Sequence, residues 1–212
     1  MGPICLHVGR WAGGGFDSVT AGNPSRMDAL ALLREDHIKV LAILDELDVK
    51  SWSGPAKDHA DRKRLVTELV MAESAHEAIE EEFFWPSVQH WLEEGRQLAA
   101  PALEQEQAAK RALQELDKLE PGDPGFDTLL ARVIADAREH IAYEEREVWP
   151  SVQRMARSEL EQIGKKMAIA KKAAPTRPHP HTPPKPGVLK TAGVAAAAVD
   201  KVRDAVTGRG KD

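Results

Sequence analysis

Apolar residues recur at helical spacing through the centre of the chain. From Asp28 to Leu47 they follow one another at intervals of three, four and seven residues, the spacing of one face of an amphipathic α-helix. Three further segments show this spacing, at 59–91, 97–119 and 126–155. Turn signals at 51–57 and 121–125 and a break at Gly95 separate them, and Pro86 should kink the second helix. Four amphipathic helices with short connections predict an all-α, up-down-up-down four-helix bundle.

The two ends of the chain differ from this centre. Residues 1–26 are glycine-rich and have no period, so we expect a disordered leader, or a segment outside the native protein if Met27 is the natural start. We place the bundle at 27–156. Residues 157–212 form a Lys/Ala/Pro-rich tail, in which 175–187 predicts a semi-rigid linker. The stretch 188–206 predicts a weak helix that forms on a protein partner, or else a solvated tail.

Composition narrows the possible partners. The net charge of −5 provides no basic field, so nucleic acid is not an expected partner. The single cysteine, Cys5, excludes an intramolecular disulfide and a Cys-rich zinc site, and it favours a reducing cytoplasm. No stretch approaches the roughly 18 consecutive apolar residues of a spanning helix, so neither membrane insertion nor export is expected.

One sequence motif occurs twice in the predicted bundle. The chain reads AHEAIEEEFFWPSVQ at 75–89 and EHIAYEEREVWPSVQ at 139–153. In each copy a histidine precedes a glutamate by four residues, as His76 with Glu80 and His140 with Glu144. Residues four apart lie on the same face of a helix, so each copy offers an imidazole beside a carboxylate. Two such copies with shared flanks predict a metal site.

The repeat also relates the first and third helices. Aligning 37–47 with 106–116 superposes Leu44 on Leu113 and Leu47 on Leu116, and it places His37 on Glu106. Burying three imidazoles and three carboxylates unpaired would cost more than the margin of about 5 to 15 kcal/mol by which folds are stable. A metal centre removes that cost. The predicted ligands are His37, His76, Glu80, Glu106, His140 and Glu144.

At these residues the chain resembles the hemerythrin-like cation-binding (HHE) domain family, over about 29–156. The Asp36-His37 pair, the two His-x-x-x-Glu-Glu segments and the prolines after them carry the resemblance. It implies a four-helix bundle with two non-haem irons, oxo- or hydroxo-bridged, with His37 and His76 on one iron and His140 on the other. Glu80 and Glu144 would bridge both irons. Manganese also accepts this ligand set.

Glu106 departs from the family pattern, because many members have a histidine there. Anionic oxygen ligands stabilise the ferric state, so a more carboxylate-rich centre should favour turnover over reversible oxygen carriage. We therefore expect a catalase-like reaction with hydrogen peroxide, or related chemistry with other oxidants in stress defence. Two alternatives remain: a protein that senses or binds dioxygen or nitric oxide or stores iron, and a metal-free structural bundle whose tail binds a partner.

The remaining conspicuous residues have less specific roles. Tyr143 could hold a hydrogen bond near the site or act in electron transfer, although a packed tyrosine is the commoner case. Glu81 and Glu145 are rotated about 140° from the histidines five residues before them, so we expect them to lie behind the ligands or on the surface and not to bind the metal. His179 and His181 in the proline-rich linker are interpreted as incidental. An apolar lid over the centre is predicted from Phe83, Phe84, Trp85 and Trp149.

Overall fold

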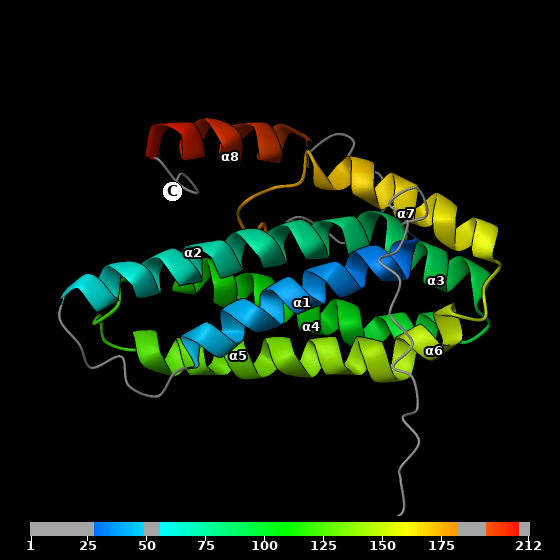
Figure 1. Cartoon of the computed structure of the whole chain (residues 1–212), viewed down its shortest axis with the longest axis horizontal. Helices are drawn as coiled ribbons and strands as arrows, with labels where there is room; N and C mark the ends of the chain where they lie inside the picture. Colours follow the sequence, from blue (N-terminus) through cyan, green and yellow to red (C-terminus); the bar gives the residue numbers. More distant parts are fainter. Residues whose placement is uncertain (1–27, 49–55, 182–193, 208–212) are drawn as a thin grey trace, which may run out of the picture.

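The computed structural model describes residues 28–48, 56–181 and 194–207, and every regular element in them is a helix (Figure 1). Four long helices run side by side, in the predicted up-down-up-down order. The expected leader and most of the Pro-rich linker lie outside the described residues. The four helices are α1 (Ala29–Leu47), α2 (Ala56–Ile79), α4 (Gly95–Leu116) and α5 (Phe126–Tyr143).

Local chemistry fixes where two of these helices begin. The Oδ1 atom of Asp28 accepts a hydrogen bond from the N–H of Ala31 at 2.9 Å, which satisfies one of the free donors at the start of α1. Gly125 precedes α5 with φ of 87°, a left-handed conformation that glycine adopts without steric cost. The glycine at this point of the predicted turn therefore sets the start of the fourth helix.

Both copies of the repeated motif leave the α-helix at their glutamate. A π-helical segment follows α2 as η2 (Glu80–Phe84) and follows α5 as η3 (Glu144–Val148). The short helices α3 (Trp85–Trp91) and α6 (Trp149–Val152) come next, each with a proline at its second residue. Proline lacks the N–H donor and clashes with the carbonyl four residues before it, and the wider π turn relieves both problems. The kink predicted at Pro86 thus takes the form of a π segment.

The connection between α3 and α4 depends on close backbone packing. Leu92 is extended, with φ of −109° and ψ of 137°, so the break in the helix lies at 92–94 and Gly95 begins α4. A Cβ atom on Gly95 would lie 2.0 Å from the carbonyl oxygen of Val88. Only glycine therefore fits at this turn.

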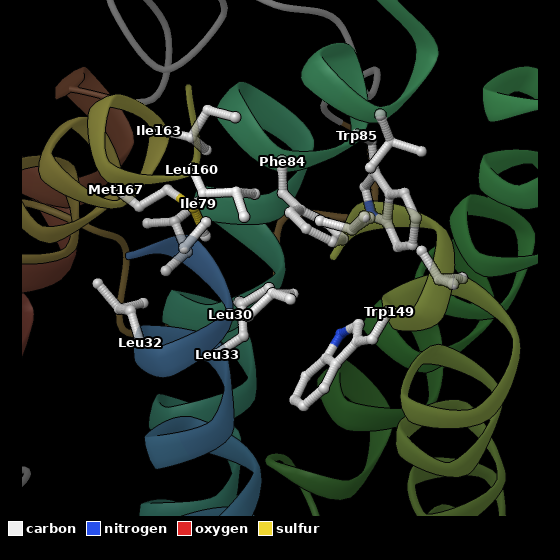
Figure 2. Close-up of a cluster of buried hydrophobic side chains, with 14 of the residues drawn as sticks. Leu30, Leu32, Leu33, Ile79, Phe84, Trp85, Trp149, Leu160, Ile163 and Met167 are labelled. Atoms are coloured by element: carbon white, nitrogen blue, oxygen red, sulfur yellow. The ribbon is translucent and has the colours of Figure 1, made fainter. Parts of the chain in front are cut away.

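The apolar core is divided into two clusters. One cluster joins α1 to the π segments and their Trp-Pro ends, and Figure 2 shows Leu30, Leu33, Phe84, Trp85 and Trp149 gathered there. The other occupies the opposite half of the bundle, around Leu44, Leu69, Leu113 and Leu130. The candidate ligands lie on the helices between these clusters, so each side of the polar layer is covered by apolar packing.

A further helix packs against the bundle beyond the expected boundary. The sequence predicts a tail with possible weak helices after Ala156, and the structure forms α7 (Arg157–Lys171), which packs on α1, α2 and η2. Its buried side includes Leu160, Ile163 and Met167. These residues follow one another at intervals of three and four, so the helix is amphipathic despite its Ala and Lys content.

The segment after α7 also contacts the bundle. The side-chain amide of Gln107 donates to the carbonyl oxygen of Pro180 at 2.7 Å, and Arg177 pairs with Asp117 at 3.2 Å. The helix α8 (Val194–Thr207) is tied to this segment, because His179 lies 3.0 Å from Asp200. None of the helices within 28–48, 56–181 and 194–207 has the length and apolarity that crossing a bilayer requires.

Candidate metal centre

The structure brings all six sequence-predicted residues into one buried layer. Their exposed fractions run from 0 to 8%. Donor atoms of His37, His76 and Glu144 lie within 4.8 Å of one another, and a second group with the same spacing contains Glu80, Glu106, His140 and Glu144. Glu144 belongs to both groups, so the layer contains two adjacent candidate cation positions.

The helical spacing of the repeat produces the expected pairs. Within one turn, the Nε2 atom of His76 lies 3.2 Å from Oε2 of Glu80, and that of His140 lies 3.5 Å from Oε1 of Glu144. The other oxygen of Glu144 lies 3.1 Å from Nε2 of His37 on α1. Glu144 therefore reaches imidazoles on two helices, while Glu80, expected to bridge, is grouped only with the second set.

Buried nitrogen and oxygen atoms that lie near one another without forming a well-directed hydrogen bond converge on this layer. They comprise the Nε2 atoms of all three histidines, both carboxylate oxygens of Glu80 and of Glu144, and Oε2 of Glu106. Buried polar atoms are nearly always paired, because an unpaired one costs roughly 1 to 3 kcal/mol. Imidazole nitrogens and carboxylate oxygens are donors suited to a divalent transition-metal ion. The residues present thus fit a bound cation.

The second nitrogen of each histidine faces a side chain on another helix. Nδ1 of His37 lies 3.0 Å from Oε1 of Glu145, and Nδ1 of His140 lies 3.0 Å from Oε1 of Gln105. Nδ1 of His76 lies 3.6 Å from Oδ2 of Asp36. Such partners orient the ring so that Nε2 faces a metal.

These partners follow a rule along the sequence, of which Asp36 and Glu145 were recognisable from the sequence motifs and Gln105 was not. Asp36, Gln105 and Glu145 each stand directly beside a candidate ligand, namely His37, Glu106 and Glu144. In each case, the residue directly beside a candidate ligand faces the Nδ1 atom of a candidate histidine on a neighbouring helix. The repeat alignment that places His37 on Glu106 also places Asp36 on Gln105, so the signal was present in the sequence.

Comparison with known proteins identifies the family. Residues 28–152 match the model of the hemerythrin HHE cation binding domain. The chain belongs to this family. The chain is 27% identical over 172 residues to an uncharacterised hemerythrin-like protein of Schizosaccharomyces pombe, covering 80% of this chain and 82% of that protein.

A solved structure has the same fold. It is the crystal structure of a hemerythrin HHE cation binding domain-containing protein from Mycobacterium kansasii, with a TM-score of 0.58 and 21% sequence identity. The match covers 82% of this chain and 98% of that one. Together with the buried histidine and glutamate groups, membership of the family establishes a hemerythrin-like, cation-binding four-helix bundle.

Two equivalent tryptophans cover the site of the HHE domain in different ways. The indole N–H of Trp85 donates a hydrogen bond to Oε1 of Glu106. Trp149 instead stacks on His37, with ring centroids 5.0 Å apart and planes 11° apart. Both tryptophans are buried in the apolar cluster that contains Phe84 (Figure 2), and Phe83 packs against this cluster, so all four residues of the predicted lid lie together. The two tryptophans therefore occupy equivalent positions in the repeat, but each contacts a different kind of side chain: a carboxylate at Glu106 and an imidazole at His37.

A second buried charged group lies beside Glu106. The ammonium group of Lys110 pairs with Glu81 at 2.5 Å, and both side chains are almost enclosed. Glu77 is also buried, and the nearby positive charge of Lys110 opposes the rise of its pKa that burial causes. Glu81 thus lies outside the predicted ligand set, as expected, and it has an ionic partner of its own.

Burial and mutual repulsion disfavour the ionised form of Glu80 and Glu106. Burial, then repulsion from Glu144 and Glu106, raises the pKa of Glu80 well above its usual value. Burial, then repulsion from Glu81 and Glu77, does the same to the pKa of Glu106. Burial alone would raise the pKa of Glu144 too, but the surrounding imidazoles outweigh it and lower that pKa. A bound cation would stabilise all three carboxylates in the ionised form.

Tyr143 forms its hydrogen bond outside the set of six residues. Its hydroxyl donates to the carbonyl oxygen of Leu98 at 2.9 Å, and its ring packs beside the cluster that contains the tryptophans. Partial burial raises the pKa of this hydroxyl. This geometry fits a packing role, and a part for Tyr143 in proton or electron transfer stays a prediction.

Proposed function

We propose that this HHE domain holds two non-haem iron ions and disproportionates hydrogen peroxide, protecting the cell from oxidants. The observation that carries the proposal is the position of Glu144, which belongs to both groups of donor atoms. In dinuclear bundle sites, carboxylates from facing helices hold two ions close together. His37 and His76 would hold one ion, and His140 with Glu106 the other.

The donor set supports turnover. Two bound irons would together supply and take back the two electrons that the reaction needs. One peroxide molecule gains two electrons and two protons and leaves as two waters. A second loses two electrons and two protons and leaves as dioxygen, so atoms and charge balance. The carboxylates of Glu80, Glu106 and Glu144 stabilise the more oxidised ions, which disfavours simple reversible oxygen binding.

The two apolar clusters also support a role in peroxide turnover. The residues around Trp85 and Trp149 cover one side of the layer and those around Leu44 and Leu113 cover the other. A site shielded in this way limits the escape of reactive species into water. The polar partners of the histidines, such as Glu145 and Gln105, keep the rings in one orientation during the reaction.

Metal analysis and oxygen evolution together test the proposal. We expect the purified protein to contain about two irons per chain and to release one dioxygen for every two peroxides consumed. The variants His76→Ala and Glu80→Ala should lose iron and activity, whereas Glu104→Ala, at an exposed position two residues before Glu106, should keep both. Iron-loaded protein that forms a stable nitric oxide or dioxygen adduct but leaves peroxide intact would favour the sensing or binding alternative. Manganese in place of iron would correct the identity of the ion.

A further inference from the structure

A pocket between α2, α4 and α5 leads from the surface to His140. Its cavity measures about 270 Å³. Arg132 and Asp136 are exposed and lie at its outer part, whereas His140 is buried and Gln105 is half-buried. Because Gln105 contacts Nδ1 of His140, the pocket reaches both a candidate ligand and the side chain that orients it.

Small side chains keep this pocket open. Ala108, Ala109 and Ala112 line it from α4, and Ala137 lines it from α5. Leu113 and Val133 add further apolar surface. Closely packed helices normally fill the space between them with large apolar side chains, so a run of alanines on facing helices leaves room for a small molecule.

The opposite side of the site is more closed. Trp149 stacks on His37, and the guanidinium group of Arg34 lies 4.8 Å from the centre of the Trp149 ring. A second pocket, of about 250 Å³, reaches Asp36 beside Lys171, but the side chains that line it include none of the six candidate ligands. Among these pockets, the one between α4 and α5 leads to the ligand set.

The side chains that line the pocket offer an anion no unpaired positive charge. Glu73 and Glu77 line it, and the guanidinium group of Arg132 at its outer part is paired with Asp136 at 3.3 Å. A negatively charged molecule would meet carboxyl groups and no free cation among the lining side chains. A small uncharged molecule would meet alanine walls and polar groups that can hydrogen-bond with it.

We propose that this pocket is the entrance through which small uncharged molecules reach the ion held by Glu80, Glu106, His140 and Glu144, and that its alanine walls set the size admitted. The inference requires a bound ion but not peroxide turnover. Nitric oxide, which is small and uncharged, therefore tests the entrance separately from the proposed function.

The test compares wall variants with a surface control. Ala109→Leu and Ala137→Leu fill the pocket from opposite helices, and Ala131→Leu adds the same side chain at an exposed position of α5. Nitric oxide association with the iron-loaded, reduced protein is followed by stopped-flow absorption, with iron content measured in each sample. We expect association to slow at least about tenfold in both wall variants and to be unchanged in the control. Unchanged association in both wall variants would overturn the proposal.

A block introduced after folding guards against wall variants that do not fold. In an Ala109→Cys variant with Cys5→Ser, methyl methanethiosulfonate adds a methylthio group to the folded, iron-loaded protein. The entrance proposal expects nitric oxide association to slow on treatment and to recover when the group is removed with a reductant. Association that stays the same after complete modification contradicts it. If association slows as expected but the untreated protein does not consume peroxide, the proposed function fails while the entrance stands.

Discussion

Lys171 and Asp36 form an ion pair that connects the last turn of α7 to the metal centre, across 135 residues of sequence. The other oxygen of Asp36 faces Nδ1 of His76. Burial alone would raise the pKa of Asp36, but His76 and Lys171 outweigh it and lower that pKa. A helix that follows the family-matched residues 28–152 therefore helps to hold a candidate ligand in place.

Loss of this support should weaken metal binding. Asp36→Asn removes the charge facing His76, and we expect metal affinity to fall about 10- to 100-fold, the usual cost of losing the partner of a metal-bound histidine. Lys171→Met leaves Asp36 buried without its lysine and should have a smaller effect in the same direction. Competition with a chelator measures both. Lys172→Met, at an exposed position next in the chain, is the matched control, and equal losses in all three variants would contradict the role of the pair.

Glu106 and Lys110 should be coupled. Aligning the two copies of the repeat superposes Glu81 on Glu145, and aligning the first and third helices superposes Lys110 on Leu41. Glu145 contacts His37, whereas Glu81, which faces a carboxylate at Glu106, pairs with Lys110 instead. Lys110 thus forms an ion pair with Glu81, whose carboxylate would otherwise be available to orient a histidine at position 106.

A double-mutant cycle tests this coupling. Glu106→His alone should lower peroxide turnover and leave the new imidazole poorly oriented, because Glu81 stays bound to Lys110. Adding Lys110→Leu frees Glu81, so the double variant should bind dioxygen or nitric oxide more stably than either single variant, with a coupling energy of about 0.5 to 3 kcal/mol. Adduct dissociation rates provide the measurement. Peroxide turnover that stays at the wild-type rate in Glu106→His would refute the role given to the carboxylate.

The metal-free protein should lose stability as pH rises. The pKa values of Glu80 and Glu106 are raised by burial and by repulsion from neighbouring carboxylates, so the folded chain keeps protons that the unfolded chain releases above a pH of about 4.5. The stability due to the protonated carboxyls is complete below that pH and is lost as pH rises through the folded-state pKa values. The lowered pKa values of Glu144, Asp36 and His140 act in the opposite direction, whereas the raised pKa values of the buried Glu73 and Glu77 add to the loss.

Thermal melts between about pH 5 and 8 check this prediction. The melting temperature of chelator-treated protein should fall with pH, and bound metal should reduce the fall because it stabilises the ionised carboxylates. Glu106→Gln should flatten the curve of the metal-free form. A melting temperature that rises with pH in the metal-free form would show that these carboxyls are ionised when the protein folds.

Gly95→Ala should destabilise the turn between α3 and α4. The added Cβ would meet the carbonyl oxygen of Val88 at 2.0 Å, and that backbone has to move. We expect a loss of about 1 to 3 kcal/mol, seen as a lower melting temperature of the metal-loaded protein. Arg96→Ala, at the next and exposed position, should have little effect. Equal melting temperatures for Gly95→Ala and wild type would mean that the turn relaxes freely.

The fold and the clustering of the six residues could be predicted because both depend on spacing along single helices and on one repeat. Four-residue intervals placed His76 with Glu80, and the alignment placed Glu106 opposite His37. Contacts between helices were harder to predict. Lys110 with Glu81, and Lys171 with Asp36, depend on how helices pack in space, and no local pattern reports that. The packing of α7 was missed because its Ala and Lys content outweighed the spacing of Leu160, Ile163 and Met167 in our reading.

The number of residues in each of the two π segments sets the direction in which the following side chains point. A π turn holds more residues than an α turn, so everything after it is rotated about the helix axis relative to a continuous α-helix. That rotation applies to Trp85 after Glu80 and to Trp149 after Glu144, which face Glu106 and His37. Deleting one residue from either segment would turn the following tryptophan by about 100° away from the site. In these two stretches the number of residues matters as much as their identity, so a family member with one residue fewer there would need another way to cover its metal.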